Sequence, residues 1–95
     1  MPYIKQYLRD SVDADIDNLV MEAKRNCAGD MDGAANYIIT RIVAGLFKPD
    51  EGWRYRYMAH AVGCLESVKA EFQRRIVAPY EDDCATANGD IGEYE

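Results

Sequence analysis

Aromatic rings and guanidinium groups lie next to one another in this chain, and they are its best-suited side chains for holding another molecule. Between Trp53 and Tyr57 the rings alternate with Arg54 and Arg56, and the chain contains seven tyrosines in 95 residues. An aromatic face can stack on a flat ligand, while a guanidinium can donate hydrogen bonds to a phosphate or carboxylate. The same rings could instead pack the ends of a small helical fold. Both interpretations of this segment stay open.

Catalytic and metal-binding patterns are weak by comparison. His60 is the only histidine, and it falls in the middle of an expected helix, beside its apolar face. Glu66 and Glu71 do not have the E-x-x-E spacing of helical metal-dependent nucleotide hydrolases. No C-x-x-C pair is formed by the three cysteines, which are Cys27, Cys64 and Cys84. The sequence therefore predicts a protein that is not an enzyme and has no metal or cofactor, with its cysteines reduced.

Charge divides the chain at Pro79. Up to that residue eleven Lys and Arg balance eleven Asp and Glu, whereas residues 80–95 contain no base. The excess acids are Glu81, Asp82, Asp83, Asp90, Glu93 and Glu95, which account for the net charge of −6. We therefore expect a helical body with an N-terminal arm over residues 1–79 and an acidic tail over residues 80–95. The tail is either solvated or docked on a neighbouring subunit or a basic partner.

Hydrophobic spacing predicts three helices. The first follows Ser11 or Asp13 and stops at Gly29, and the second runs from Asp30 or Asp32 to about Phe47. The third runs from about Trp53 to Ala78, where Pro79 should end it, and Asn88-Gly89 should form a turn with positive φ. Its inner face would be Met58, Ala61, Val62, Leu65, Val68, Phe72 and Ile76. The expected fold is an all-α three-helix bundle with an extended N-terminal arm and the acidic tail.

Length and composition indicate which kinds of partner the protein is expected to bind. A chain of 95 residues covers its helical faces poorly on its own, so we expect a homo-oligomer. The body has no surplus of basic residues, which argues against direct DNA or RNA binding. No apolar run approaches the ~20 residues needed to cross a bilayer. The first residues do not form a signal-peptide apolar region, so we expect a cytoplasmic protein without membrane contact.

Several short motifs resemble those of a family of short proteins from bacteriophages, prophages and bacteria. The matching stretches begin with Pro2-Tyr3-Ile4 and Asn36-Tyr37-Ile38-Ile39-Thr40, and the most specific one lies in the third helix. It comprises Gly63, Leu65-Glu66, Lys69, Glu71-Phe72, Arg74-Arg75 and Ala78-Pro79-Tyr80-Glu81, and it is followed by Asn88-Gly89-Asp90. The resemblance spans nearly the whole chain. It implies a phage setting, the cytoplasm of a host cell, and a role in blocking host defence by stoichiometric binding.

Together these features predict a non-enzymatic binding protein that sequesters a small anionic, nucleotide-like ligand at a subunit interface. Cationic groups would contact phosphate, a tyrosine would stack on a base, and an amide would bind a polar edge. The expected ligand-binding residues are Tyr3, Asn36, Arg41, Lys69, Arg74 and Tyr80. The alternative is a protein–protein inhibitor whose acidic tail blocks a basic groove on a host protein. Its expected partner-binding residues are Glu81, Asp82, Asp83 and Asp90.

Overall fold

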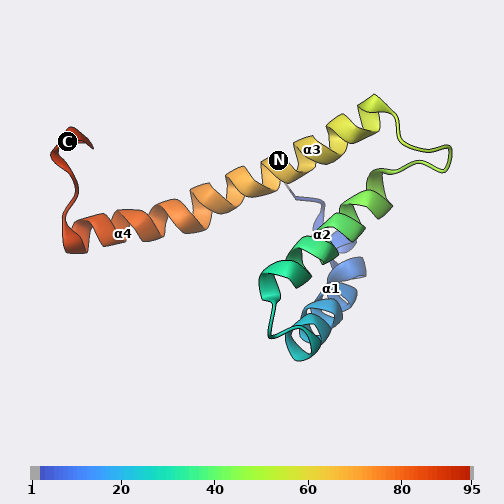
Figure 1. Cartoon of the computed structure of the whole chain (residues 1–95), viewed down its shortest axis with the longest axis horizontal. Helices are drawn as coiled ribbons and strands as arrows, with labels where there is room; N and C mark the ends of the chain where they lie inside the picture. The colour runs from blue at the N-terminus through green and yellow to red at the C-terminus, as the bar shows by residue number, and fades with distance from the viewer. Residues whose placement is uncertain (1–2, 95) are drawn as a thin grey trace. The chain divides into compact units, whose positions relative to one another are not determined.

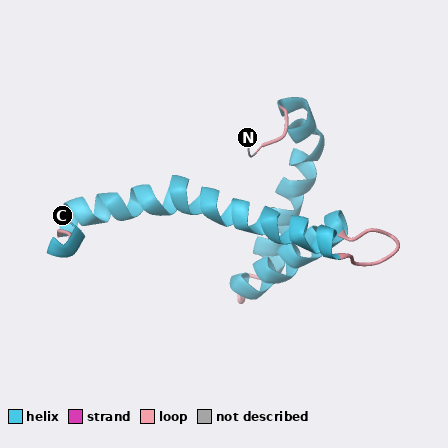
Figure 2. Ribbon diagram, turned by 90° about the horizontal axis from the view of Figure 1, so that it is seen from above, coloured by secondary structure: helices cyan, strands magenta, loops and turns pink. Residues whose placement is uncertain are grey.

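Every regular element in the part of the chain that the computed structural model describes, residues 3–94, is a helix (Figures 1 and 2). The prediction of an all-α fold is therefore confirmed. Met1, Pro2 and Glu95, which belong to the predicted N-terminal motif and acidic tail, lie outside the described residues. The elements are α1 (Gln6–Asn26), α2 (Met31–Phe47), α3 (Tyr55–Phe72), the π-helical segment η1 (Gln73–Val77), α4 (Ala78–Asn88) and the 3₁₀ helix η2 (Gly92–Tyr94).

The chain forms two compact units, Met1–Trp53 and Arg54–Glu95. In the first unit α1 and α2 form a helical hairpin and contact each other. In the second unit α3 continues through η1 into α4 as a single helical rod (Figure 1). By charge, the sequence predicts a different division, into a body over residues 1–79 and an acidic tail over residues 80–95. That division stays a prediction.

Helix α1 begins at Gln6, so the predicted start at Ser11 or Asp13 is wrong. The hydroxyl of Ser11 does not cap a helix; it donates to the backbone carbonyl of Leu8 at 2.6 Å, inside the first turns of α1. Serine and threonine can also make such bonds to a preceding turn within a helix, besides capping helix starts. The extended N-terminal arm is correspondingly shorter than expected.

The link between α1 and α2 contains a capping bond that the sequence predicts. A carboxylate oxygen of Asp30 accepts the backbone N–H of Gly33 at 2.9 Å, which confirms Asp30 as the N-cap of α2. Helix α1 ends at Asn26, and the backbone N–H of Cys27 bonds one turn back. Gly29 lies beyond this end and does not adopt a positive φ, so it is not the residue that stops the helix.

The third helix does not end before Pro79, and that prediction is wrong. It begins at Tyr55, two residues after Trp53, and the helical backbone continues without a break to Asn88. A residue before proline is usually extended, but Ala78 has the helical values φ −62° and ψ −47°. Residues beyond the proline therefore extend the same rod.

The π-helical segment explains how the rod passes Pro79. Within a regular α-helix a proline cannot donate to the carbonyl four residues back, and its ring crowds that carbonyl. The turn just before the proline is wider than an α-helical turn. In it the backbone N–H of Ala78 bonds to the carbonyl of Gln73, which is five residues back, not four. We attribute the continuation to this wider turn, since it displaces the carbonyl groups that would otherwise meet the proline ring.

The acidic segment is helical rather than extended up to Asn88. Gly89 follows with φ 88°, and its backbone N–H bonds to the carbonyl of Ala85 at 2.8 Å. The positive φ predicted at this glycine is confirmed, and it closes α4 because glycine adopts this conformation at little cost. Of the residues after Gly89, Gly92–Tyr94 form the short helix η2.

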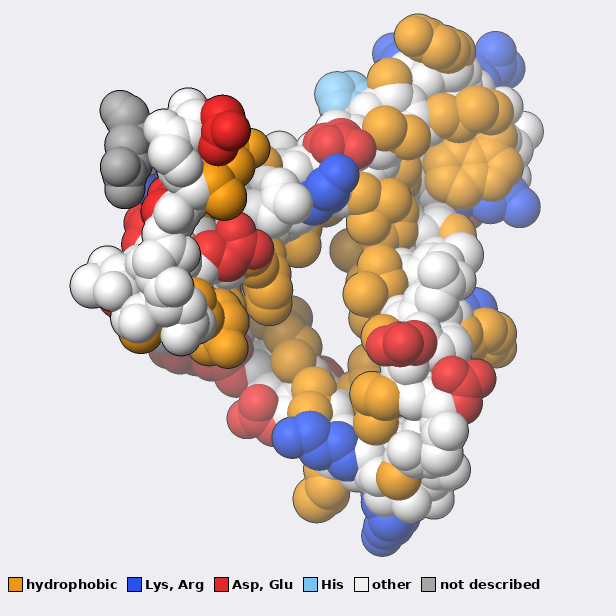
Figure 3. All heavy atoms as spheres, turned by 60° about the vertical axis from the view of Figure 1, so that its left-hand side comes forward, with side chains coloured by type: hydrophobic (Ala, Val, Ile, Leu, Met, Phe, Trp, Pro, Cys, Tyr) orange, Lys and Arg blue, Asp and Glu red, His pale blue; other side chains and the backbone are white. Residues whose placement is uncertain are grey.

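Neither unit encloses a large apolar core. Among residues 3–94 only Ala61 is buried, with 7% of its surface exposed. Large apolar side chains lie on the surface of both units, and Figure 3 shows them as strips of orange atoms along the helices. Within the described residues, no helix combines the length and apolarity required to span a membrane.

Candidate functional site

An open apolar groove lies between α1 and α2 in the hairpin unit. It has a volume of about 280 Å³. Apolar residues recur three and four positions apart on both helices, so that one side of each helix contributes to the groove. The lining residues are Leu19, Val20, Ala23 and Lys24 of α1 and Met31, Ala35, Ile38, Ile39 and Ile42 of α2.

The groove suits an apolar side chain better than a nucleotide. Lys24 is the only charged residue among those that line it, and none of the lining side chains is aromatic. Grooves of this composition typically receive the apolar face of an amphipathic helix. Ile39 and Ile42 keep 49% and 45% of their surface exposed, so their apolar atoms are open to such a contact.

Arg41 and Tyr37 form an aromatic–guanidinium pair on α2. Arg41 donates to the hydroxyl of Tyr37 at 3.0 Å, and its guanidinium carbon lies 5.7 Å from the centre of the ring. Both side chains are exposed. The pair holds a positive charge beside an aromatic ring, an arrangement that can contact an anionic, flat ligand. The prediction named Arg41 but missed Tyr37, although the i, i+4 spacing on one helix could have indicated it.

Two further pairs have the same composition. The guanidinium of Arg9 lies 5.7 Å from the ring centre of Tyr3, and Arg9 also donates to the carbonyl of Ile4 at 2.7 Å. Arg56 lies 4.7 Å from the ring centre of Tyr57 and donates to its hydroxyl at 2.7 Å. Each of the three described pairs joins residues close in sequence, so each is a local feature of its own helix or helix start.

The alternating segment at residues 53–57 is divided by the boundary between the units. Trp53 belongs to the hairpin unit, while Arg54 precedes the first residue of α3 and makes no capping hydrogen bond with its side chain. Tyr55 keeps 84% of its surface exposed, against 39% for Trp53. Packing therefore does not account for Tyr55, and the two interpretations of this segment stay open for the other rings.

The cations predicted on the second unit lie near η1. Arg74 donates to a carboxylate oxygen of Glu71 at 2.5 Å, and Arg75 lies 3.8 Å from the same oxygen. Glu71 is the least exposed of the three, with 24% of its side chain accessible. Arg74, predicted to contact phosphate, is thus already paired with a carboxylate. An incoming anion would have to compete with Glu71 for it.

The structure does not bring the six predicted ligand-binding residues together within either unit. Three of them belong to the hairpin unit and three to the rod. On α2, Asn36 and Arg41 are five positions apart and point about 140° away from each other around the helix. On the rod, Lys69 and Tyr80 are separated by about 16 Å along the helix axis. A shared pocket would need side chains from more than one unit or more than one copy.

The predicted partner-binding acids lie on α4 and just beyond its end. Glu81, Asp82 and Asp83 occupy successive helical positions and are exposed, so their carboxylates spread around the rod instead of forming one strip. Asp90 lies past the end of α4, where its carboxylate accepts the backbone N–H of Ile91 at 2.8 Å. These four residues form an acidic end of the second unit.

The cysteines make no disulfide, and no three potential metal ligands cluster, in the described part of the chain. Cys64 is exposed, while Cys27 and Cys84 are half-buried. The candidate binding surfaces are therefore the hairpin groove, the exposed aromatic–guanidinium pairs and the surface of the rod.

Comparison with known proteins yields one relationship. A protein family described as a domain of unknown function (DUF6899) matches residues 1–91. No curated protein and no solved structure matches the chain.

Proposed function

From the premise that this chain belongs to the DUF6899 family of domains of unknown function, we propose that it is a non-enzymatic binding protein that works as an assembly of two or more copies. This proposal rests on one observation, the uncovered apolar side chains along both units. On the rod, for example, Val68 and Phe72 keep 62% and 55% of their surface exposed. Burying such surface is favourable by about 25 cal/mol per Å², so association would complete the core that each unit lacks.

The ligand that we propose is a small anionic, nucleotide-like molecule held where subunits meet. The Arg41–Tyr37 pair supports this choice because it places a guanidinium beside an exposed ring. Asn36, Lys69, Arg74 and Tyr80 are proposed to come from a neighbouring copy and to complete the site with Tyr3. In a phage setting, such sequestration would deprive a host defence of its nucleotide signal in the cytoplasm of the host cell.

A second candidate function is inhibition of a host protein by the acidic end of the rod. The supporting observation is that Glu81, Asp82 and Asp83 are held on a helix and exposed. A rigid acidic helix loses less conformational entropy on docking into a basic groove than an extended tail does. In this case the bound species is a basic protein surface, and α4 carries the recognition.

Native mass spectrometry combined with a thermal-shift screen tests the first candidate. The probes are mononucleotides and cyclic oligonucleotides, tested on the wild type, on Arg41→Gln and on Arg25→Gln as the matched control. Arg25 is also an exposed helical arginine, but it is paired with Glu22. A ligand at 100 times its dissociation constant raises the stability by about 2.7 kcal/mol, which is readily detected in a small domain.

We expect an oligomer whose melting temperature rises with a nucleotide probe, and a smaller rise for Arg41→Gln than for Arg25→Gln. If the protein is an oligomer but its melting temperature does not change with any nucleotide, the nucleotide-like ligand is ruled out. Inhibition of a host protein by the acidic end of the rod then remains as the candidate function. A protein that remains a monomer at every concentration contradicts the assembly itself.

A further inference from the structure

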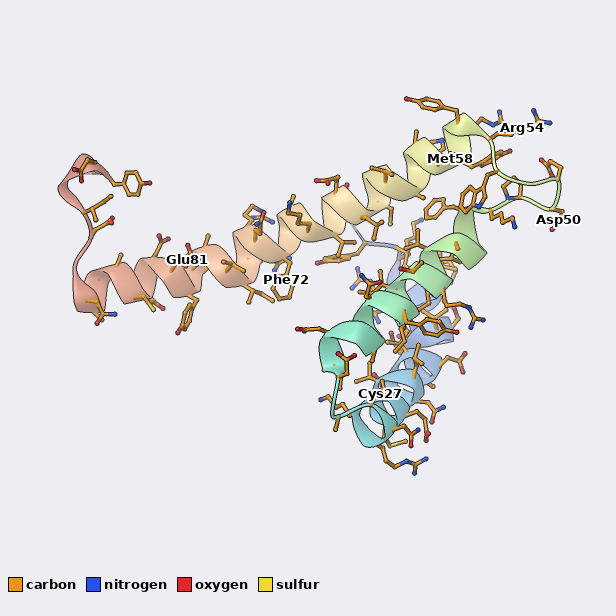
Figure 4. The ribbon with its side chains drawn as sticks, in the orientation of Figure 1. Cys27, Asp50, Arg54, Met58, Phe72 and Glu81 are labelled. Carbon is orange, nitrogen blue, oxygen red and sulfur yellow. The ribbon has the colours of Figure 1, made fainter. Side chains whose placement is uncertain are left out.

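The rod formed by α3, η1 and α4 is polarised in charge along its length. From Arg54 to Leu65 the basic side chains are Arg54, Arg56 and His60, and there is no acid. At the other end Glu81, Asp82 and Asp83 lie in the first two turns of α4, and no base follows Pro79. Figure 4 labels Arg54 at the start of this unit and Glu81 toward its far end.

One apolar stripe follows the same rod. Met58, Leu65 and Phe72 are seven residues apart from one to the next, and Val68 falls between the last two. This is the spacing that keeps side chains on one seam when two helices pack side by side. These four large side chains keep between 41% and 62% of their surface exposed, whereas the small Ala61 on the same face is buried. The seam is therefore open at its large side chains.

The π-helical segment keeps the stripe on one side. Beyond Phe72 a seven-residue repeat calls for apolar residues at positions 75 and 79, but Ile76 and Tyr80 each come one residue late. The wide turn from Gln73 to Ala78 takes up one extra residue, since its hydrogen bond spans five residues instead of four. Ile76 and Tyr80, which are 56% and 69% exposed, thereby return to the seam.

The completed stripe is nearly symmetric about Val68. Leu65 and Phe72 lie at similar distances on either side of it, as do Met58 and Tyr80. A stripe with this symmetry can pack against an identical stripe that runs in the opposite direction. Arg54 and Asp83 occupy equivalent places just outside its two ends.

We infer that the rod pairs with the rod of a second copy in antiparallel orientation, through the seam from Met58 to Tyr80. This inference rests on the proposed self-association and names the surface and the partner. Antiparallel pairing brings Arg54 of each copy to Asp83 of the other, whereas parallel pairing would place the two acidic ends side by side. The paired rods are related by a two-fold axis near Val68, and the same contacts are made twice.

Disulfide trapping tests the orientation. The variants are made in a full-length background in which Cys27, Cys64 and Cys84 are changed to serine. One protein then carries Met58→Cys, a second carries Tyr80→Cys, and the control carries Ser67→Cys on the side of α3 away from the seam. Positions 58 and 80 are about 33 Å apart along one continuous helix, so a disulfide between them joins two chains.

We expect the mixture of Met58→Cys and Tyr80→Cys to give a covalent dimer, while each variant alone and the control stay largely uncrosslinked. Crosslinking of each variant with itself would show parallel pairing and overturn the inference. A sedimentation measurement on the serine background separates this failure from that of the proposed function. If the serine background is an oligomer but no crosslink forms, the protein assembles through another surface, and only the antiparallel pairing is overturned. If the serine background is a monomer, both the pairing and the proposed self-association are overturned.

Discussion

The backbone N–H of Ala78 bonds to the carbonyl of Gln73, five residues back, directly before Pro79. This single wide turn joins α3 to α4 and lets one helix continue where a proline would be expected to end it. It also sets the direction in which Ile76 and Tyr80 point relative to Phe72. A local change of backbone pitch thus has consequences for the whole exposed stripe.

Replacing Pro79 should raise the stability of the helix while weakening self-association. Pro79→Ala restores a backbone donor and removes the ring, and alanine favours a helix interior over proline by up to about 3 kcal/mol. We expect a higher melting temperature and higher helical content by circular dichroism. If the wide turn relaxes to a regular helix, Ile76 and Tyr80 leave the seam, and self-association measured by sedimentation weakens.

The control for this change is Thr86→Ala, which alters helix propensity on α4 without touching η1. Thr86 donates to the backbone carbonyl of Asp82 at 3.0 Å, within α4. Its variant should have unchanged association. Tighter association of Pro79→Ala than of the wild type would refute the role given to the wide turn.

The capping bond at the start of α2 should have a measurable effect on stability. Asp30→Ala removes the acceptor of the Gly33 N–H bond and should lower the free energy of unfolding by about 1 kcal/mol. Asp32→Ala, in the first turn of the same helix, should cost only a few tenths of that, because it loses a favourable helix-dipole contact alone. Urea denaturation followed by circular dichroism measures both, and equal losses would argue against the cap.

Exchanging charges between the ends of the rod tests the antiparallel contact. Arg54→Glu and Asp83→Arg should each weaken the dimer, because two exposed contacts per dimer, each worth up to about 1 kcal/mol, become repulsive. The dissociation constant should rise by about tenfold or more. The double variant restores opposite charges at both contacts and should recover the affinity. Additive weakening in the double variant, measured by sedimentation, would speak against the pairing.

The hairpin should depend on its groove residues more than on its outer surface. Ile38 is half-buried in the groove, and Ile38→Ala should lower the free energy of unfolding by about 1–2 kcal/mol, less than for a fully buried isoleucine. Tyr37 is 62% exposed, and Tyr37→Ala should cost about 0.5 kcal/mol or less. Chemical denaturation of both variants checks the difference; a reversed order would mean that the groove does not hold the hairpin together.

Much of the fold follows from local sequence signals. The periodicity of α2 and the carboxylate of Asp30 correctly predict where that helix begins and ends. The effect of Pro79 could not be read in the same way, because the penalty of a proline within a helix depends on whether the preceding turn can widen. The start of α1 was predicted wrongly for a related reason. A serine hydroxyl can cap a helix start, but it can also bond to a carbonyl one turn back inside a helix, as that of Ser11 does.

The candidate site was less accessible to sequence reasoning. Arg41 stands out as the one basic residue of α2, but its partner Tyr37 is found only when the i, i+4 spacing is applied to polar pairs. Arg74 was expected to be available for phosphate, yet Glu71 lies one turn away and pairs with it. The type of a side chain indicates what it can bind, while its neighbours on the helix decide whether it is available.

Sedimentation equilibrium of the purified full-length protein, at several concentrations, tests the central claim that this chain completes its core by joining a second copy. We predict a mass of about twice the 10.7 kDa of one chain, or a higher multiple. A mass of one chain at every concentration, in a protein that remains fully helical and unfolds cooperatively, would contradict it.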